Sequence, residues 1–403
     1  MPQIVGNRTK WGVIDMGKYE KRVYLEAIHK RYRKAKRTDK GKILDEFCSV
    51  CGYQRKYAIR LLGRKPVKSV RRPGRPSQYN QPVLLTVLRK LWLATDQMCS
   101  KRLVAAMPLW LPHYETRFGA LDESTRAKLA GISPASIDRL LKPVRAQHPK
   151  GLSGTKPGTL LKNQIPIRTT HWDITLPGFM EADTVAHCGN SLAGDFVWSL
   201  TLSDILTGWT ECRATWSKGS SGVLDQIKAI EQVLPFALRG FDCDNGSEFL
   251  NHHLLRYFTA HPAKPTFTRS RPYQKNDNAH VEQKNWTHVR QLFGYERFDN
   301  PELTRLMNAL YAEEWSQLQN HFYPTLKLKQ KERIGARYRK QYHAPKTPYQ
   351  RVMDCESVTD DTKSKLRTLH QILNPFDLKQ QIDAKLRVIF SMVKVTSIMT
   401  QRS

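Results

Sequence analysis

The chain has 403 residues, too many for one typical core, so we expect two to four domains. Hydrophobic residues make up 40% of it, which suits globular cores and excludes general disorder. The formal net charge is +30, and a surplus this large favours an anionic partner, most often nucleic acid. Charge alone leaves open a ribosome-like or merely soluble basic protein.

The seven cysteines are widely spread and form no disulfide-like framework, which fits a reducing cytosol. Cys48 and Cys51 form a lone C-x-x-C pair, which we expect to pack rather than bind zinc. Residues 1–16 lack the apolar run of a signal peptide, and no stretch is apolar enough to cross a membrane. The sequence therefore predicts a cytoplasmic, nucleoid-associated protein with no membrane partner.

Residues 17–65 are predicted to be helical. An amphipathic run at 42–50 stops at Gly52 and resumes at 53–62, which is typical of a helix-turn-helix. We expect the second helix to contact DNA through four polar side chains: Gln54, Arg55, Lys56 and Arg60. A plain helical hairpin with solvated charges is the alternative.

Residues 67–80 predict a basic linker, because their prolines and glycines exclude a helix or a central strand. Arg72 and Arg75 are candidate DNA contacts, since an Arg-rich Pro/Gly strand can lie in a narrow A·T minor groove. Gly74-Arg75-Pro76 resembles the AT-hook core. A plain basic linker is an equally good interpretation.

Residues 81–145 predict a second helical domain. A helix at 122–130 is followed by Ser133, which we expect to cap the next helix with Pro134 at its first position. This is a second helix-turn-helix candidate, with Arg139 as its DNA contact.

The character of the chain changes near residue 169 to alternating strands and helices. Strands are predicted at 178–185, 196–202, 209–216, 238–243 and 265–268. Helices are predicted at 221–234, 250–260 and 278–293. Three hairpin-connected strands followed by alternating helices and strands predict an α/β core with a mixed sheet.

Beyond this core the helical pattern continues through 301–322. Residues 327–346 hold eight Lys/Arg against one Glu, which predicts contact with phosphates. Thr347-Pro348 and Asn374-Pro375 each predict a helix start, so we expect a tail of short helices.

Charge is distributed unevenly. Residues 1–80 hold 22 Lys/Arg against 6 Asp/Glu, a net charge of +16, whereas residues 181–260 hold 5 against 10, a net charge of −5. A site for divalent cations needs such a local inversion, because hard cations prefer carboxylate oxygens.

Within the acidic stretch, Asp244 ends an apolar strand and precedes a tight Asn-Gly turn, a place where open α/β sheets hold ligands. Asp242 shares its face and is the local competitor. Asp183 lies on the first strand beside Glu181, where a buried acid must be paired or metal-bound. Asp204, at a hairpin tip, is predicted to be a turn residue.

Glu282 lies on the helix that begins near Asn278, in a stripe that also holds Asn285. A solvated helix surface is the alternative for this residue taken alone. In combination and in order, three runs resemble the integrase catalytic core of bacterial insertion-sequence transposases and retroviral integrases: Glu181-Ala182-Asp183-Thr184, Asp244-Asn245-Gly246-Ser247-Glu248-Phe249 and Asn276-Asp277-Asn278-Ala279-His280-Val281-Glu282-Gln283-Lys284-Asn285.

The resemblance covers roughly residues 170–345, and 37 residues lie between Asp244 and Glu282, similar to the spacing in that superfamily. It implies a ribonuclease-H-like fold with Asp183, Asp244 and Glu282 as catalytic metal ligands for two Mg²⁺ (or Mn²⁺) ions. The zinc-binding module of retroviral integrases is absent from the sequence, which favours the bacterial branch.

The resemblance further implies that the enzyme cuts and joins double-stranded DNA at element ends and at a target, as a homo-oligomer on DNA. It implies that three residues support the metal ligands by hydrogen bonds and that a fourth contacts DNA: Asn245, Glu248, Asn278 and Lys284. Two alternatives stay open: a ribonuclease-H-like nuclease, and a DNA-binding regulator that has lost catalysis.

The domain boundaries that we expect combine these elements: a helix-turn-helix domain at 1–66, a linker at 67–80, a helical domain at 81–145, a linker at 146–168, the catalytic core at 169–300, a helical and basic extension at 301–345, and a helical C-terminal region at 346–403.

Overall fold

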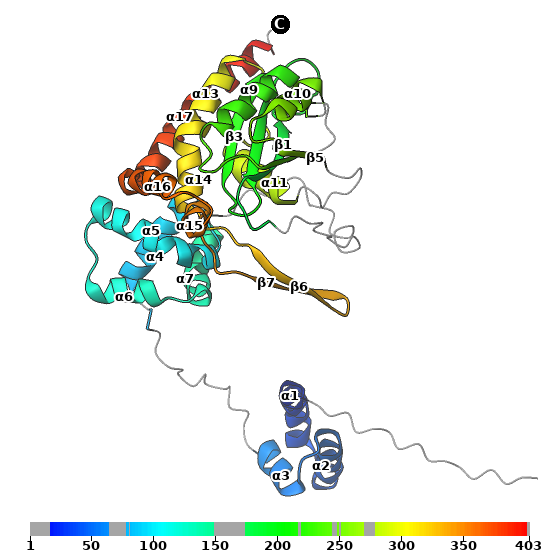
Figure 1. Cartoon of the computed structure of the whole chain (residues 1–403). Coiled ribbons are helices and arrows are strands. Elements are labelled where there is room, and N and C mark those ends of the chain that lie inside the picture. Colours follow the sequence, from blue (N-terminus) through cyan, green and yellow to red (C-terminus); the bar gives the residue numbers. More distant parts are fainter. Residues whose placement is uncertain are drawn as a thin grey trace, which may run out of the picture. The chain divides into compact units, whose positions relative to one another are not determined.

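The computed structural model of the chain describes residues 17–63, 78–79, 81–148, 174–216, 219–243, 248–249, 251–269 and 279–400. The chain divides into two compact units, Met1–Gln78 and Tyr79–Ser403 (Figure 1). Each unit builds a hydrophobic core of its own.

In its described residues, 17–63 and 78, the first unit contains three helices: α1 (Lys18–Lys34), α2 (Arg37–Cys51) and α3 (Arg55–Gly63). Gly52 ends α2 with a positive φ of 67°, and its N–H bonds to the Cys48 carbonyl at 2.9 Å. A left-handed residue at this position favours glycine, so the turn lies where the sequence predicts it. Cys51 is buried in the core with Phe47, as predicted for a packing cysteine. DNA binding by this unit stays a prediction.

The second unit begins with four helices: α4 (Pro82–Ala94), α5 (Ser100–Phe118), α6 (Glu123–Gly131) and α7 (Pro134–Gln147). The cap at Ser133 is confirmed, since its hydroxyl accepts the Ser136 N–H. These helices share one hydrophobic core with the C-terminal helices, and the Trp110 indole donates to the Phe322 carbonyl at 3.1 Å. The domain boundaries drawn from the sequence stay predictions.

A mixed five-stranded sheet forms the centre of the second unit, as predicted. Its strands are β1 (Phe179–Ala186), β2 (Val197–Asp204), β3 (Thr210–Trp216), β4 (Gly240–Cys243) and β5 (Thr266–Arg269), in the order β3-β2-β1-β4-β5. β1, β2 and β3 are antiparallel neighbours, whereas β4 and β5 continue from β1 in parallel.

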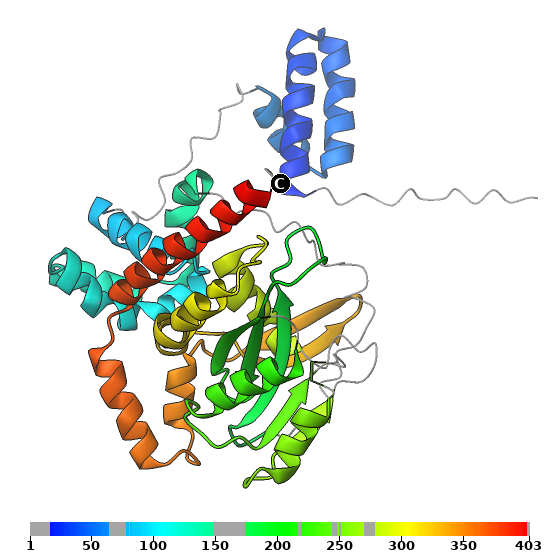
Figure 2. The same cartoon turned by 90° about the horizontal axis from the view of Figure 1, so that it is seen from above.

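Helices cover both faces of this sheet (Figure 2). Met180 and Ala182 of β1 point to the face packed by α9 (Ser220–Glu231) and α10 (His252–Ala260). The opposite face packs against a helical segment made of α11 (Ala279–Lys284), the π-helix η1 (Asn285–Arg290) and α12 (Gln291–Phe293). A second such segment follows: α13 (Glu302–Leu310), η2 (Tyr311–Trp315) and α14 (Ser316–Phe322).

The basic stretch after α14 forms an antiparallel hairpin that the sequence did not predict. Its strands are β6 (Leu328–Ile334) and β7 (Arg337–Tyr342), joined through Gly335 at a positive φ of 59°. The helical segment predicted at 301–322 is confirmed, since α13, η2 and α14 run from Glu302 to Phe322.

The C-terminal region contains α15 (Pro348–Asp354), α16 (Asp360–Ile372) and α17 (Pro375–Thr400). Both predicted starts are confirmed: Thr347 caps α15, and the Asn374 side chain accepts the Phe376 N–H at 3.0 Å. The prediction of short helices is wrong for α17, which runs for 26 residues because its apolar positions pack on α13, η2 and α14.

Candidate active site

The face of β1 that carries Glu181 and Asp183 points toward α11. Glu181 is only 3% exposed, and its Oε2 accepts the Val281 N–H at 3.0 Å. The first N–H groups of a helix have no partner within the helix, so a carboxylate satisfies one of them well. A buried acid of β1 thus docks the backbone of the helix that carries Glu282.

Asp183 is held through both of its carboxylate oxygens. Its Oδ2 accepts the Asn285 amide at 2.6 Å, and its Oδ1 accepts the Thr184 N–H at 2.7 Å. Asn285 begins the π-helical turn η1, and such turns are frequent at functional sites because they redirect side chains. The Asn285 Oδ1 atom is buried and has no hydrogen-bond partner within the part of the chain that the structure describes.

Glu248 lies close to the same part of β1. It is 1% exposed, and its Oε1 accepts the hydroxyl of Thr184 at 2.9 Å. Thr184 follows Asp183 directly, so this hydrogen bond from Thr184 to Glu248 stabilises the backbone next to Asp183, the candidate metal ligand. The role assigned to Glu248 from the sequence stays a prediction.

The register of β1 and β4 reaches the two candidate aspartates. The parallel pairing runs to Ala182 and Cys243, the residues immediately before Asp183 and Asp244. Asp242, the competitor of Asp244, accepts the Thr268 hydroxyl at 2.6 Å. That hydrogen bond ties Asp242 to β5 within the sheet.

Several candidates lie outside the residues that the structure describes: Asp244, Asn245, Asn278, Arg72 and Arg75. The backbone of Glu282 is helical, whereas its side chain is outside the description. Within the described residues, no three His, Cys, Asp or Glu side chains form a group that could hold a metal ion. The structure therefore brings together β1, which carries Asp183, and α11, which carries Glu282.

Asp204 is confirmed as a turn residue. Its Oδ1 accepts the Gly178 N–H at 2.8 Å, and its Oδ2 accepts the Thr207 N–H at 2.7 Å. Burial raises the pKa of this carboxyl, while the hydrogen bonds from Thr207 and Gly178 act in the opposite direction.

The turn that follows, residues 205–208, gives all four of its carbonyls to cationic side chains. Lys327 donates to residues 205 and 206, Arg351 to residue 207 at 3.1 Å, and Lys284 to residue 208 at 3.2 Å. Burial, together with the charges of Arg102 and Arg351, lowers the pKa of Lys284 to about 7. The structure therefore places Lys284, the candidate DNA contact on α11, half-buried against this turn.

The other described DNA-binding candidates are exposed: Gln54, Arg55, Lys56, Arg60 and Arg139. Arg55 forms an ion pair with Asp45, and Arg139 donates to the Ser136 hydroxyl at 3.1 Å. The exposed ion pair of Arg55 with Asp45 contributes little to stability, so Arg55 can be drawn to a phosphate.

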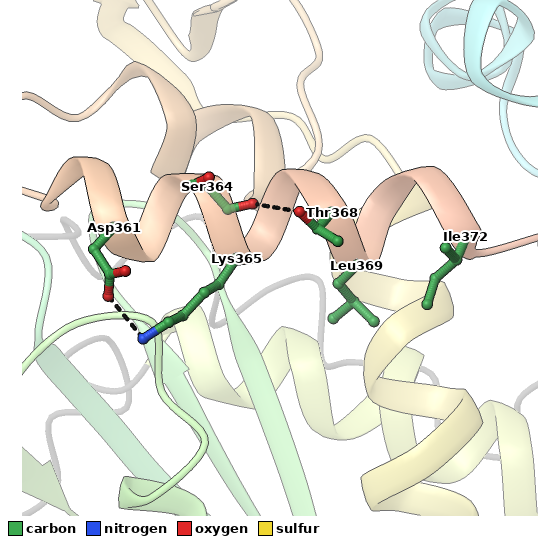
Figure 3. Close-up of a pocket in the computed structure, with 6 residues that line it drawn as sticks. All are labelled: Asp361, Ser364, Lys365, Thr368, Leu369 and Ile372. Carbon is green, nitrogen blue, oxygen red and sulfur yellow. Dashed lines mark hydrogen bonds and ion pairs between the residues drawn. The ribbon is translucent and has the colours of Figure 1, made fainter.

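A hollow on α16 is separate from these groups (Figure 3). One helix supplies its whole lining: Asp361, Ser364, Lys365, Thr368, Leu369 and Ile372. Asp361 and Lys365 are paired with each other at 2.7 Å. The hollow contains none of the candidate catalytic residues. As for membranes, no helix among the described residues combines the length and apolarity needed to cross one.

Fold and site together define an α/β protein with a mixed five-stranded sheet and a braced carboxylate on its first strand. No known family model matches the sequence. The chain is 42% identical over 335 residues to the uncharacterised protein y4rM of Sinorhizobium fredii, covering 81% of this chain and 93% of that protein. The chain belongs to the family of that protein.

Two solved structures are similar to parts of the chain. One is the catalytic core domain of BIV integrase, with 15% identity and a TM-score of 0.27, covering 43% of this chain and 91% of the other. The second is a chain of the simian T-cell lymphotropic virus intasome in complex with PP2A regulatory subunit B56 gamma. It has 15% identity and a TM-score of 0.31, and the match covers 59% of this chain and 73% of the other.

Sequence reasoning missed the two residues that organise the described part of the site. Glu181 was noted only as a neighbour of Asp183, although its burial is what docks α11. Asn285 was noted only as part of a helical stripe. Its position three residues after Glu282 was the available signal, because residues three apart share a helical face.

Proposed function

We propose that this chain is a transposase or integrase that binds the ends of a mobile DNA element and catalyses metal-dependent cleavage and strand transfer. The observation that carries the proposal is the Asn285–Asp183 hydrogen bond. It joins the strand that bears one candidate acid to the helical segment that bears another, Glu282.

The pairing of β1 with β4 supports a position for the third acid, Asp244, near the other two. Ala182 and Cys243 are paired across β1 and β4, and Asp183 and Asp244 are their next residues in the chain. Since one peptide step spans about 3.8 Å between Cα atoms, we infer that Asp244 follows the end of β4 close to the part of β1 that carries Asp183. Side chains at matching positions of neighbouring parallel strands point to the same face. We infer that Asp183, Asp244 and Glu282 converge there.

The donor chemistry fits a hard divalent cation such as Mg²⁺ or Mn²⁺. Such ions take oxygen ligands, and the described site offers the Asp183 carboxylate beside the partnerless Asn285 Oδ1. Asp183, Asp244 and Glu282 would hold two ions. When bound, the ions would activate the attacking oxygen and stabilise the leaving oxygen of a phosphoryl transfer.

Three side chains of the protein position the elements of the site. Glu181 fixes the start of α11, Asn285 orients the Asp183 carboxylate, and Glu248 fixes Thr184. Orientation of this kind accounts for much of the catalysis of phosphoryl transfer, because the protein does little covalent chemistry itself.

The mixed five-stranded sheet flanked by helices is the α/β core that the sequence predicts, and it supports the same class of reaction. The two units divide the work in this proposal. Unit Met1–Gln78, with exposed Arg55 and Lys56 on α3, binds element ends, and unit Tyr79–Ser403 performs the chemistry. We propose that the enzyme acts as a homo-oligomer on DNA.

The test is a cleavage assay with the full chain, in Mg²⁺, on a plasmid that carries this gene with its flanking DNA. The matched substrate is an RNA–DNA hybrid of equal length. We expect cleavage at the element boundaries and joining to other DNA. Preferential cleavage of the hybrid would instead support a ribonuclease-H-like nuclease, and binding without cleavage of either substrate would support a regulator.

A further inference from the structure

The hairpin of β6 and β7, here called the basic arm (residues 328–342), stands apart from the hydrophobic cores of its unit (Figure 1). None of its residues belongs to a hydrophobic cluster of the described residues. Leu328, Ile334 and Tyr342 are 46%, 55% and 45% exposed. A lone two-stranded hairpin is marginally stable in water, so an arm of this kind indicates a binding partner.

The register of the arm separates its charges by face. Lys331 lies opposite Lys340, and Arg333 lies opposite Tyr338. Residues directly opposite each other in an antiparallel pair share a face of the ribbon. Glu332, the one acid of the arm, lies on the other face. Lys331, Arg333, Tyr338 and Lys340 therefore form a cationic face without an acid.

Repulsion between like charges on this face destabilises the arm in the free protein. Like charges directly opposite each other destabilise a sheet, and Lys331 faces Lys340. Partial burial and the charge of Lys340 lower the pKa of Lys331, whose ammonium lies 4.4 Å from the Tyr338 ring centroid. An anion bound along this face removes the repulsion.

We propose that the cationic face of the basic arm binds duplex DNA, with the ribbon lying in the major groove. The major groove, about 12 Å wide and 8.5 Å deep, admits a two-stranded ribbon. The arm has strands about 4.8 Å apart and a length of about 23 Å. That the ligand is DNA rests on the proposed function. The inference adds that the basic arm is the surface of the catalytic unit that binds this DNA.

The base of the arm is fixed to the turn at residues 205–208, which also contacts α11. Lys327, at the foot of β6, donates to the carbonyls of residues 205 and 206, and its own carbonyl accepts the His343 N–H at 2.9 Å. Lys284 of α11 binds the same turn through residue 208. DNA on the arm is thereby held at a defined distance from α11 and from Asp183.

The experiment compares two triple variants of the full chain that lose the same charge. The arm variant is K331Q/R333Q/K340Q, and the control is K363Q/K365Q/R367Q on α16. Binding of a fluorescent 30-base-pair duplex of arbitrary sequence is measured by anisotropy, without divalent cation, over a range of salt. Circular dichroism and melting temperature establish that both variants are folded.

We expect the slope of log K against log salt to become shallower by about 2 to 3 for the arm variant, and by less than about 1 for the control. At 0.1 M salt the Kd of the arm variant should rise on the order of 10- to 100-fold. Equal slopes for both variants would overturn the proposal.

A double-stranded RNA of the same length separates the nucleic acids, because its major groove is too narrow for a ribbon. We expect RNA binding to change equally in both variants, and a selective loss of RNA binding would overturn the proposal. The two proposals can fail separately. If the wild-type chain cleaves no DNA but the arm variant alone loses duplex binding, the proposed function fails and this inference stands.

Discussion

At the scale of single residues, Asp183 is a carboxylate whose orientation is set before any partner arrives. One oxygen is held by Asn285 and the other by its neighbour's N–H. Groups that orient a metal-binding carboxylate commonly affect metal affinity or activity by about 10- to 100-fold. Asn285 is therefore a positioning residue in the proposed site.

Asn285→Ala should lower both the rate of DNA cleavage and the apparent affinity for Mg²⁺ by about 10- to 100-fold. The reason is that Asp183 loses the hydrogen bond that orients it. The measurement is the cleavage rate as a function of Mg²⁺ concentration. Gln283→Ala, at an exposed position of the same helix, is the control. An Asn285→Ala enzyme with an unchanged Mg²⁺ dependence would remove this residue from the site.

Two buried histidines make the stability of the larger unit depend on pH. Burial, and secondarily Arg290, lowers the pKa of His187 to about 3. Burial, and secondarily His370, lowers the pKa of His321 to about 3. The unfolded chain takes up protons near the ordinary pKa of about 6.5 while the folded chain does not, so stability is lost as pH falls below that value.

We expect each of the two to reduce the free energy of unfolding by about 2 kcal/mol between pH 7.5 and pH 5. His187→Phe should remove its share of this decrease, since the ring already stacks on Phe298 at 4.9 Å. Urea unfolding followed by tryptophan fluorescence at both pH values is the measurement. A variant that keeps the full wild-type decrease would contradict the assignment.

At the scale of elements, Gly178 joins the start of β1 to the neighbouring strands. Its N–H donates to Asp204 at 2.8 Å, and its carbonyl accepts the Arg239 N–H at 2.8 Å. Its φ is +109°, and an added Cβ would meet the Ala237 carbonyl oxygen at 2.2 Å. Only glycine combines this conformation with this close approach.

Gly178→Ala should destabilise the larger unit by more than about 2 kcal/mol, because both the backbone conformation and the contact with Ala237 are unfavourable. Gly131→Ala is the matched control, since that helical position has open space and gains helix propensity. The measurement is the melting temperature of each variant. Equal melting temperatures for the two variants would show that the strand start can rearrange.

The sequence predicted the five strands of the central sheet because their β-branched and apolar runs are bounded by turns. It did not predict the basic arm, because Leu328–Ile334 and Arg337–Tyr342 are mostly exposed and carry no apolar alternation. It also underestimated the length of α17, whose continuity comes from packing on distant helices. Local periodicity reports burial, so elements defined by charge or by long-range packing escape it.

The candidate site, like the fold, was predictable from the sequence only in part. Asp183 stood out as an acid on a strand, and Asp204 as a turn residue. Asn285 and Glu181 did not, because their roles depend on contacts of β1 with α11 and η1 across about 100 residues of chain. The DNA contact of Lys284 stays a prediction, and the sequence did not predict its hydrogen bond to the Gly208 carbonyl.

At the scale of the whole molecule, charge is divided between units that build separate cores. On α3 of the first unit, Arg55 and Lys56 are exposed, and Arg55 pairs with the exposed Asp45. A phosphate can therefore replace that partner at little cost.

Arg55→Ala/Lys56→Ala should weaken duplex binding and make its salt slope shallower by about 2, since two phosphate contacts are lost. The control Lys30→Ala/Arg33→Ala removes the same charge from exposed positions of α1. Anisotropy titrations over a range of salt provide the measurement. Identical slopes for the two double variants would remove α3 from the DNA interface.

The most direct test of the central claim is strand cleavage and joining by Asp183→Asn, Asp244→Asn and Glu282→Gln enzymes on DNA that carries the gene and its flanks. We predict that each substitution abolishes Mg²⁺-dependent products while leaving duplex binding nearly unchanged, because each removes one ligand of a shared metal site. Wild-type product yields from any one of the three variants would contradict the assignment of that acid. Wild-type yields from Asp183→Asn would contradict the account as a whole.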